Sequence, residues 1–262
     1  MFCIENVTKK IKEKKPVIGT HVRWSDSTVV EIMAESGIDF IWFDGEHGAI
    51  TIDTMLNHVR AAQAHGVAAF YRVPWNDPVL MKPYLEIGVD AIIIPFINNA
   101  KQAELAVKSI LYPPAGIRGW APGRINNYGF MPLDEYLEKA KKIWKIIQIE
   151  HIDAVNNIDE ILEVEGIDAI IVGMYDLSGS MGMMAQMQNP KLLEKLDYVA
   201  EKCNKAGIPY GSSISYDETL IKQWFTRGAA FMTIGGDLDF VRDGSVQTIQ
   251  GTNAIFNKIY GK

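Results

Sequence analysis

The sequence has little of what several classes of protein depend on. Only two of its 262 residues are cysteines, Cys3 and Cys203, which excludes a disulfide framework and a cysteine-based metal site. Its 26 lysines and arginines are outnumbered by 32 aspartates and glutamates, and no basic cluster occurs beyond the lysines at positions 9 to 15. Because a basic patch is what attracts nucleic acid, we expect no nucleic-acid partner.

Long hydrophobic runs are also missing. The longest run, 91–97, is far below the roughly 20 apolar residues that cross a bilayer, and it contains Pro95. At the N-terminus apolar residues precede the lysines, which is the reverse of a signal peptide. We therefore predict a cytoplasmic protein with no membrane partner, and the two cysteines fit that reducing compartment.

The sequence does contain a regular alternation of short hydrophobic runs and longer amphipathic segments. The runs are nearly continuous, as parallel strands covered on both faces are, and they predict strands at 17–22, 40–43, 68–73, 91–95, 143–149, 169–172, 208–211 and 230–234. Helical periodicity predicts helices at 28–36, 52–65, 78–87, 101–111, 133–141, 154–163, 190–206, 219–227 and 238–256.

Eight strand-helix units without a composition shift or linker predict a single (β/α)8 TIM-barrel domain over residues 1–262. An open, doubly wound sheet is the alternative. Such a sheet usually carries a glycine-rich nucleotide turn after its first strand, and the sequence has neither that turn nor a P-loop. Ile4, Val7 and Ile11 predict an N-terminal amphipathic helix that closes one end of the barrel.

In such a barrel the active site lies at the carboxyl ends of the strands, and polar residues gather there in this sequence. Gln148 and Glu150 alternate with apolar neighbours, so both point toward the barrel mouth. With Asp176 from the next strand, Glu150 supplies two carboxylates that suit a hard divalent cation. The same carboxylates could pair with Arg72 instead, and the spacing alone leaves both interpretations open. His21 either lines the pocket or belongs to the core.

Schiff-base aldolases need a lysine near the end of a strand. The predicted sixth strand, 168–173, contains none, and Lys145 lies early in the fifth strand, away from the mouth. The sequence therefore disfavours imine chemistry.

Five motifs in succession resemble the HpcH/HpaI aldolase family, whose members include metal-dependent 2-oxo acid aldolases. Residues 43–47 resemble its D-G-E-H signature, 72–78 its R-x-x-W-N-D-P segment, and 112–119 its Y-P-P-x-G-x-R-G segment. The sequences Q-I-E at 148–150 and D-L-S at 176–178 continue the match, which extends over about residues 16–236.

The resemblance implies a class II aldolase that cleaves or forms 4-hydroxy-2-oxo acids, giving pyruvate and an aldehyde. It implies a Mg²⁺, Mn²⁺ or Co²⁺ ion held by Glu150 and Asp176. It also implies a homo-oligomer, a hexamer or trimer of dimers, in which the C-terminal helix packs on a neighbouring subunit. Further implied roles are a catalytic base for His47, an enolate contact for Arg72, pairing with His47 for Glu86, 2-oxo acid binding for Gln148, Gly173, Met174 and Tyr175, and orientation of the metal's waters for Asp44 and Glu46.

The chain departs from the family pattern at three positions. Met174 follows Gly173 where the family commonly has proline, His151 follows Glu150 where it has threonine or serine, and Glu86 replaces an aspartate. These differences bear on substrate identity more than on reaction type. Two alternatives remain: a citrate-lyase-type enzyme acting on a CoA ester, for which basic residues are not evident, and a non-catalytic barrel with binding or assembly roles.

Overall fold

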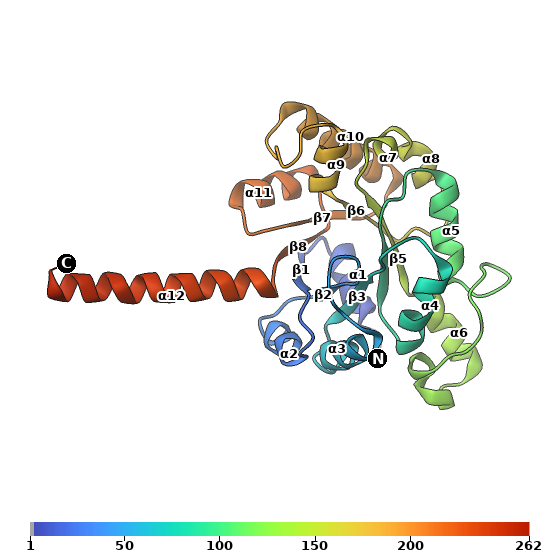
Figure 1. The fold of residues 1–262 in the computed structure, drawn as a ribbon. Helices are drawn as coiled ribbons and strands as arrows, with labels where there is room; N and C mark the ends of the chain where they lie inside the picture. The colour runs from blue at the N-terminus through green and yellow to red at the C-terminus, as the bar shows by residue number, and fades with distance from the viewer. Residues whose placement is uncertain (1–2, 262) are drawn as a thin grey trace.

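Eight parallel strands form a closed barrel in the computed structural model, which describes residues 3–261 (Figure 1). Each strand pairs with the next in chain order, and β8 pairs back to β1. The strands are β1 (Val17–Val22), β2 (Phe40–Asp44), β3 (Ala68–Arg72), β4 (Ala91–Ile94), β5 (Trp144–Ile149), β6 (Ala169–Val172), β7 (Tyr210–Ile214) and β8 (Phe231–Gly236). The predicted (β/α)8 barrel is confirmed, and the open doubly wound sheet is excluded.

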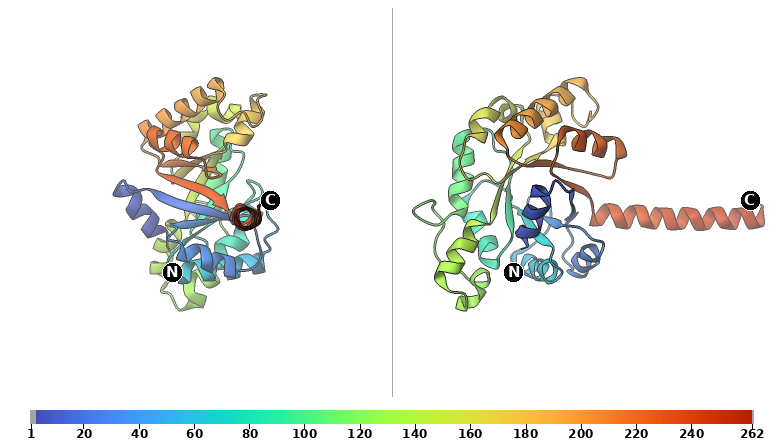
Figure 2. Two further views of the ribbon diagram at one scale, coloured as in Figure 1. Left: turned by 90° about the vertical axis from the view of Figure 1, so that its left-hand side faces the viewer. Right: turned by 180° about the vertical axis from the view of Figure 1, so that it is seen from behind.

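Helices surround the barrel, and a long C-terminal helix extends away from it (Figure 2). They are α1 (Ile4–Lys12), α2 (Thr28–Glu35), α3 (Ile52–Ala64), α4 (Pro78–Ile87), α5 (Ala100–Ile110), the 3-10 helix η1 (Arg124–Gly129), α6 (Leu133–Lys141), α7 (Ile152–Asn156), α8 (Ile158–Leu162), α9 (Met174–Ser180), α10 (Pro190–Ala206), α11 (Glu218–Arg227) and α12 (Asp237–Tyr260).

Several sequence-based boundaries differ from the structure, and two of these differences have a clear physical reason. The predicted helix 154–163 is two short helices, because Asn157 between them leaves the helical conformation at φ −100° and ψ 14°. The seventh strand continues past 211 to Ile214, since Ser212 and Ser213 pair with Met232 and Thr233 of β8. The apolar run predicts a strand only to 211, whereas the serines that follow it extend the strand into the polar mouth of the barrel.

At the end where the strands begin, the barrel lumen is apolar and is closed by α1, as predicted. Phe40 stacks on Phe70 with ring centroids 4.6 Å apart, and Ile4 and Val7 of α1 are buried against the same cluster. Buried Asp90 accepts hydrogen bonds from the backbone amides of Cys3 and Ile4, at 2.6 and 3.2 Å. These contacts hold α1 at the end of the barrel where the strands begin.

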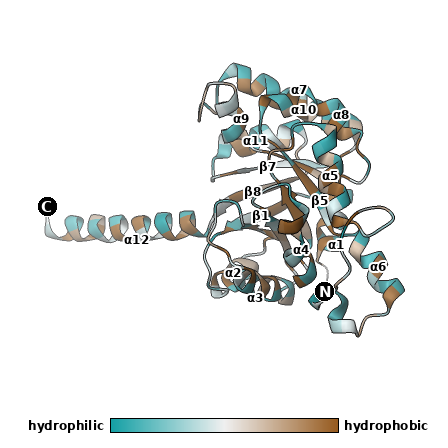
Figure 3. Cartoon of the chain, turned by 45° about the vertical axis from the view of Figure 1, so that its right-hand side comes forward, coloured by the Kyte–Doolittle hydropathy of each residue, from teal (hydrophilic) through white to brown (hydrophobic). Residues whose placement is uncertain are grey.

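The last helix differs from the others. Figure 3 shows apolar residues along α12 although the helix projects from the barrel, and only Asp237 of its 24 residues is buried. Its exposed apolar side chains include Phe240, Val241, Ile249 and Ile255. Among residues 3–261, no helix combines the length and apolar character needed to span a membrane.

Candidate active site

A polar layer occupies the end of the lumen where the strands terminate. Because side chains alternate along a strand, Asp44 shares the lumen face of Phe40 and Trp42, and Arg72 shares that of Phe70. Asp44 and Arg72 are also direct partners in the β2–β3 ladder. The fold thus places the beginning of the D-G-E-H segment beside the beginning of the R-x-x-W-N-D-P segment.

Arg72 is buried and held by two carboxylates. Its Nε and Nη2 donate to the two oxygens of Asp44 at 3.0 and 2.8 Å, a bidentate pair. Its Nη1 lies 2.8 Å from Glu46 Oε2, an ion pair without hydrogen-bond alignment. Burial opposes ionisation of Asp44, but the hydrogen bonds and charge of Arg72 outweigh it and lower the pKa of Asp44 to about 2. The site therefore fixes a guanidinium ion in one orientation.

The D-G-E-H motif is a turn built around Asp44. Its Oδ1 accepts hydrogen bonds from the amides of Glu46 and His47, at 3.1 and 3.2 Å. A Cβ at Gly45 would lie 2.1 Å from the hydroxyl oxygen of Tyr71 and 2.7 Å from the carbonyl oxygen of Arg72. Glycine is required at position 45 because the turn passes so close to β3.

His47 lies at the rim, with its side chain 63% exposed, and its Nε2 is 3.7 Å from Glu46 Oε2. The expected pairing with Glu86 is wrong within this chain, since Glu86 forms an ion pair with Arg118 at 2.9 Å. The physical reason is the direction of α4. Glu86 stands near its C-terminus, about 12 Å along the axis from its start, and so at the end of the barrel remote from His47.

Glu150 lies deep in the mouth. Its Oε1 accepts the amide of Phe96 at 2.8 Å, and its Oε2 accepts the side-chain amide of Gln148. Burial raises the pKa of Glu150 to about 8; the Phe96 amide opposes this rise, while the carboxylates of Asp176 and Glu46 add to it. Arg72 makes its bonds to Asp44 and Glu46, so the alternative in which Glu150 is its direct partner is not observed.

The residues around Glu150 fit a divalent cation. Within residues 3–261 no group of three or more His, Cys, Asp or Glu side chains is placed to hold a metal. The two carboxylates expected to bind one, those of Glu150 and Asp176, are near enough for the charge of Asp176 to raise the pKa of Glu150. Burial is the main cause of that raised pKa and the charge of Asp176 adds to it, so a bound cation would stabilise the ionised carboxylates. The side-chain oxygen of Gln148 is buried beside them without a hydrogen-bond partner. This all-oxygen set suits Mg²⁺ or Mn²⁺ with water and substrate as further ligands.

The expected 2-oxo acid-binding residues lie next to Glu150. A Cβ at Gly173 would approach Glu150 Oε2 to 2.7 Å, so glycine allows this close packing. Met174 and Tyr175 open α9, where the first backbone amides have no intrahelical acceptor. The Met174 side chain is buried, and its sulfur accepts a hydrogen bond from Trp224 Nε1 at 3.2 Å. The residue that stands in place of the family's proline is therefore packed against α11.

A cavity of about 180 Å³ opens at the mouth beside these residues. It is lined by residues from β1, β7, β8, α9 and α12, among them His21, Arg23, Tyr175, Ser213, Ser215 and Asp237. His21 Nε2 lies 2.6 Å from Ser213 Oγ, and burial lowers the pKa of His21 to about 3, so the ring is neutral. His21 is thus a pocket residue.

Sequence reasoning did not identify Arg23 or Asp237 as residues of the site. Asp237 does begin a helix, and its Oδ1 accepts the amide of Leu238. Its Oδ2 also accepts the amides of Arg23 and Trp24, both at 2.8 Å, which fixes the chain leaving β1. An exposed arginine directly after a strand is common, and only its contacts with Asp44 and Asp237, beside the neighbouring strands, distinguish this one.

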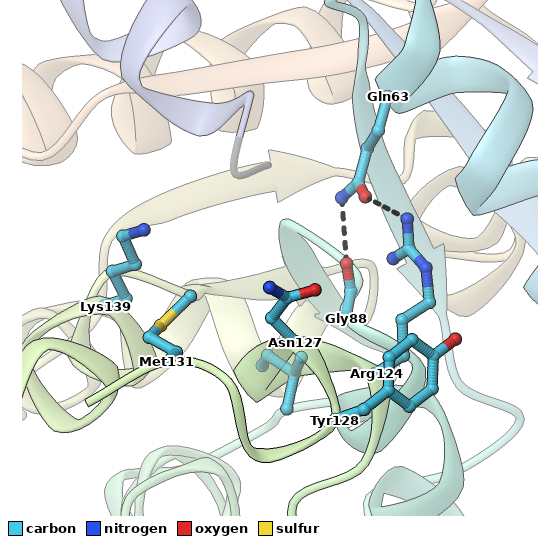
Figure 4. A pocket seen from close by; sticks show the side chains of 8 residues that line it. Gln63, Gly88, Arg124, Asn127, Tyr128, Met131 and Lys139 are labelled. Atoms are coloured by element: carbon cyan, nitrogen blue, oxygen red, sulfur yellow. Dashed lines mark hydrogen bonds between the residues drawn. The ribbon is translucent and has the colours of Figure 1, made fainter. Parts of the chain in front are cut away.

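Two further groups lie at the opposite end of the barrel. Lys145 is buried there beside Asp168, which agrees with the sequence-based argument against an imine. A cavity of about 340 Å³ also lies at this end, where α3 and α4 terminate (Figure 4). In it Gln63 donates to the carbonyl of Gly88 and accepts from Arg124, both at 2.9 Å. These polar groups satisfy one another and are remote from the mouth.

Comparison with known proteins agrees with this geometry. A family model described as HpcH/HpaI aldolase/citrate lyase matches residues 18–243. The chain belongs to this family. A 4-hydroxy-2-oxo-heptane-1,7-dioate aldolase from Shigella flexneri is 33% identical over 228 residues, which are 87% of this chain and 85% of the relative. The family and the aldolase class of lyase, both predicted from the sequence, are confirmed.

Solved structures of the HpcH/HpaI family share the fold. An HpcH/HpaI aldolase from Desulfitobacterium hafniense DCB-2 superimposes with a TM-score of 0.88 at 29% identity, covering 94% of this chain and 95% of that one. The citrate synthase SbnG superimposes with a TM-score of 0.82 at 27% identity, covering 97% and 98%.

Proposed function

We propose that this HpcH/HpaI family member is a class II, divalent-metal-dependent aldolase that cleaves or forms 4-hydroxy-2-oxo acids, with pyruvate as the common product. The observation that carries the proposal is the joint placement of the fixed Arg72 guanidinium and the Glu150–Asp176 carboxylates in one polar layer. The names of the curated relatives, which are aldolases of a 4-hydroxy-2-oxo dicarboxylate, support the substrate class.

Each residue has a task that its surroundings allow. Glu150 and Asp176 would hold the cation, which when bound supplies Lewis-acid polarisation of a 2-oxo group. Arg72, locked by Asp44, presents a second positive group to the oxygen on which charge develops as the carbon–carbon bond breaks. The amides that open α9 and the Gln148 side chain would bind the substrate carboxylate.

Proton transfer falls to His47 in this proposal. Cleavage requires removal of the proton on the 4-hydroxyl group, and His47 is an imidazole at the rim with open access to a substrate. Glu46, between Arg72 and His47, is the nearby carboxylate able to orient the ring or stabilise its protonated form. In this proposal Glu46 therefore has the role of pairing with His47 that the family resemblance implied for Glu86.

The proposal is tested by pyruvate release from a panel of 4-hydroxy-2-oxo acids. We expect EDTA to abolish turnover, Mg²⁺, Mn²⁺ or Co²⁺ to restore it, and Glu150→Ala or Asp176→Ala to weaken Mn²⁺ binding measured by calorimetry. Inactivation by borohydride in the presence of pyruvate would show an imine and overturn the metal mechanism. Citrate formation from oxaloacetate and acetyl-CoA, without aldol cleavage, would select the CoA-ester alternative instead.

We also propose a cytoplasmic homo-oligomer in which α12 packs on a second copy of the chain. The helix leaves the barrel with apolar side chains exposed along its length, and such a surface is costly to leave in water. Exposed Trp120 and Phe130 lie in the segment around η1 and provide apolar surface elsewhere on the same chain. Deleting residues 241–262 should lower the oligomer mass measured by light scattering; an unchanged mass would place the interface elsewhere.

A further inference from the structure

Arg23 is a second guanidinium at the mouth. Its Nε lies 3.8 Å from Asp44 Oδ2, the oxygen that accepts Arg72 Nη2 at 2.8 Å. One carboxylate oxygen therefore lies between the two arginines. Arg72 is buried, whereas the Arg23 side chain is 43% exposed and lines the 180 Å³ cavity. The two cations differ in access, although both belong to the same site.

The carboxylates around Arg23 are engaged elsewhere. Asp44 already accepts its hydrogen bonds from Arg72 and from the amides of Glu46 and His47, and 3.8 Å is too long for a further one. Asp237 accepts three backbone amides, and Asp239 pairs with Arg242 at 3.1 Å. Arg23 thus lines the cavity, and its guanidinium has no close carboxylate partner among the other residues that line it.

We propose that Arg23 selects acceptor aldehydes that carry a terminal carboxylate, by binding that carboxylate in the cavity between β1, β7 and β8. The inference rests on the aldolase function proposed above and adds a residue that determines specificity. Arginine binds carboxylates through two parallel hydrogen bonds. The hydroxyl groups of Tyr175, Ser213 and Ser215 line the same cavity and provide further polar contacts.

The size and position of the cavity limit the ligand. Its volume of about 180 Å³ leaves room for a short carboxylated chain. Because Asp44 links the two arginines, a substrate whose 2-oxo end lies at Arg72 has its other end close to Arg23. A four-carbon semialdehyde acid is therefore a suitable probe.

A competing explanation is that Arg23 only balances the charge of Asp44. In that case its loss would act through Arg72 and would slow reactions of all aldehydes alike. A selective effect on acidic aldehydes distinguishes the two explanations, because charge balance at Asp44 does not depend on the tail of the substrate.

The experiment compares pyruvate addition to 4-oxobutanoate and to its neutral isostere 4-methylpentanal, using the Mn²⁺-loaded enzyme. We expect the unaltered enzyme to prefer 4-oxobutanoate, and Arg23→Gln to lower the ratio of the two kcat/KM values by about 10–100-fold, mainly through KM. Arg23→Lys should lower the ratio less. Arg60→Gln, a change of an exposed arginine on α3 that does not line the cavity, should leave the ratio as it is.

The ratio is measured within one preparation, so partial misfolding of a variant cancels. An unchanged ratio in Arg23→Gln, or an unaltered enzyme that prefers the neutral aldehyde, overturns the role of Arg23 while leaving the aldolase proposal intact. Failure of the unaltered enzyme to add pyruvate to either aldehyde or to cleave any 4-hydroxy-2-oxo acid counts against the aldolase proposal itself.

Discussion

Arg72 and Arg118 are both buried and both paired with carboxylates, yet they serve different parts of the molecule. Arg72 lies in the barrel mouth and binds both oxygens of Asp44. Arg118 follows α5 and directs Nε and Nη2 to one oxygen of Glu86, with its guanidinium 4.5 Å from the centre of the Tyr112 ring. Both are ion pairs between an arginine and a carboxylate, so the place of each pair in the fold decides its function.

Their surroundings explain this division. Around Arg72 lie Glu46, His47 and the Glu150–Asp176 carboxylates, which are groups that bind or move protons. Around Arg118 lie the aromatic rings of Tyr112 and Tyr136, which give packing and a hydroxyl contact at 3.4 Å. In the proposed function the first arginine binds the substrate, whereas the second connects α4 to the segment that follows α5.

Among the changes that distinguish the surroundings of Arg72 from those of Arg118, we expect His47→Ala to reduce activity most. Without the base, aldol cleavage should fall by roughly 10²–10⁴-fold. Oxaloacetate decarboxylation should be retained to a large extent, since loss of CO₂ forms the enolate without removal of a hydroxyl proton. Both reactions are measured by pyruvate formation on the same preparation. Equal losses would assign His47 to metal or substrate binding.

Arg72→Lys should have the next largest effect. Lysine keeps the charge but cannot form the bidentate pair with Asp44 or present a planar set of donors, so turnover should fall by about 10²-fold in both reactions. The melting temperature is measured alongside the kinetics to separate loss of function from loss of structure. A Lys variant that keeps most of its kcat would make Arg72 a structural residue like Arg118.

The opposite outcome is expected for Glu86→Gln. This change leaves Arg118 as an unpaired buried charge, and the unfolding free energy should drop by about 3–5 kcal/mol while kcat changes little. The double variant Glu86→Leu with Arg118→Met removes both charges and should recover most of that stability. If Glu86→Gln instead reduced aldol cleavage at unchanged stability, Glu86 would act on His47 after all, and the contrast between the two arginines would disappear.

The fold, and the side of the strand on which some site residues lie, were predictable because they depend on local patterns. Continuous apolar runs indicated the strands, and alternation placed Gln148 and Glu150 on the lumen side. Three other features depend on geometry that no motif contains. Glu86 lies near the C-terminus of α4, away from the barrel mouth. Ser213 belongs to β7 because it pairs with β8. Arg23 belongs to the site because it lies near Asp44 on the neighbouring strand.

The smallest predicted effect concerns stability beside the mouth. His58 is buried, with Nε2 2.8 Å from the carbonyl oxygen of Trp24 and Nδ1 3.0 Å from Ser27 Oγ, and its ring stacks on Phe43 at 5.1 Å. Burial lowers the pKa of His58, so the folded state keeps the ring neutral.

In the unfolded chain His58 regains its ordinary pKa of about 6.5 and binds a proton more readily than in the folded state. The contribution of His58 to stability is therefore fully present above pH 6.5 and is lost as the pH falls below that value, with a slope of at most about 1.4 kcal/mol per pH unit. Urea unfolding between pH 8 and 5 measures this slope. His58→Gln should reduce it, whereas a His65→Gln control, at a partly exposed ring beside Glu35, should not. Equal slopes in the His58 variant and the unaltered protein would show that His58 does not control the stability of the chain leaving β1, where Arg23 lies.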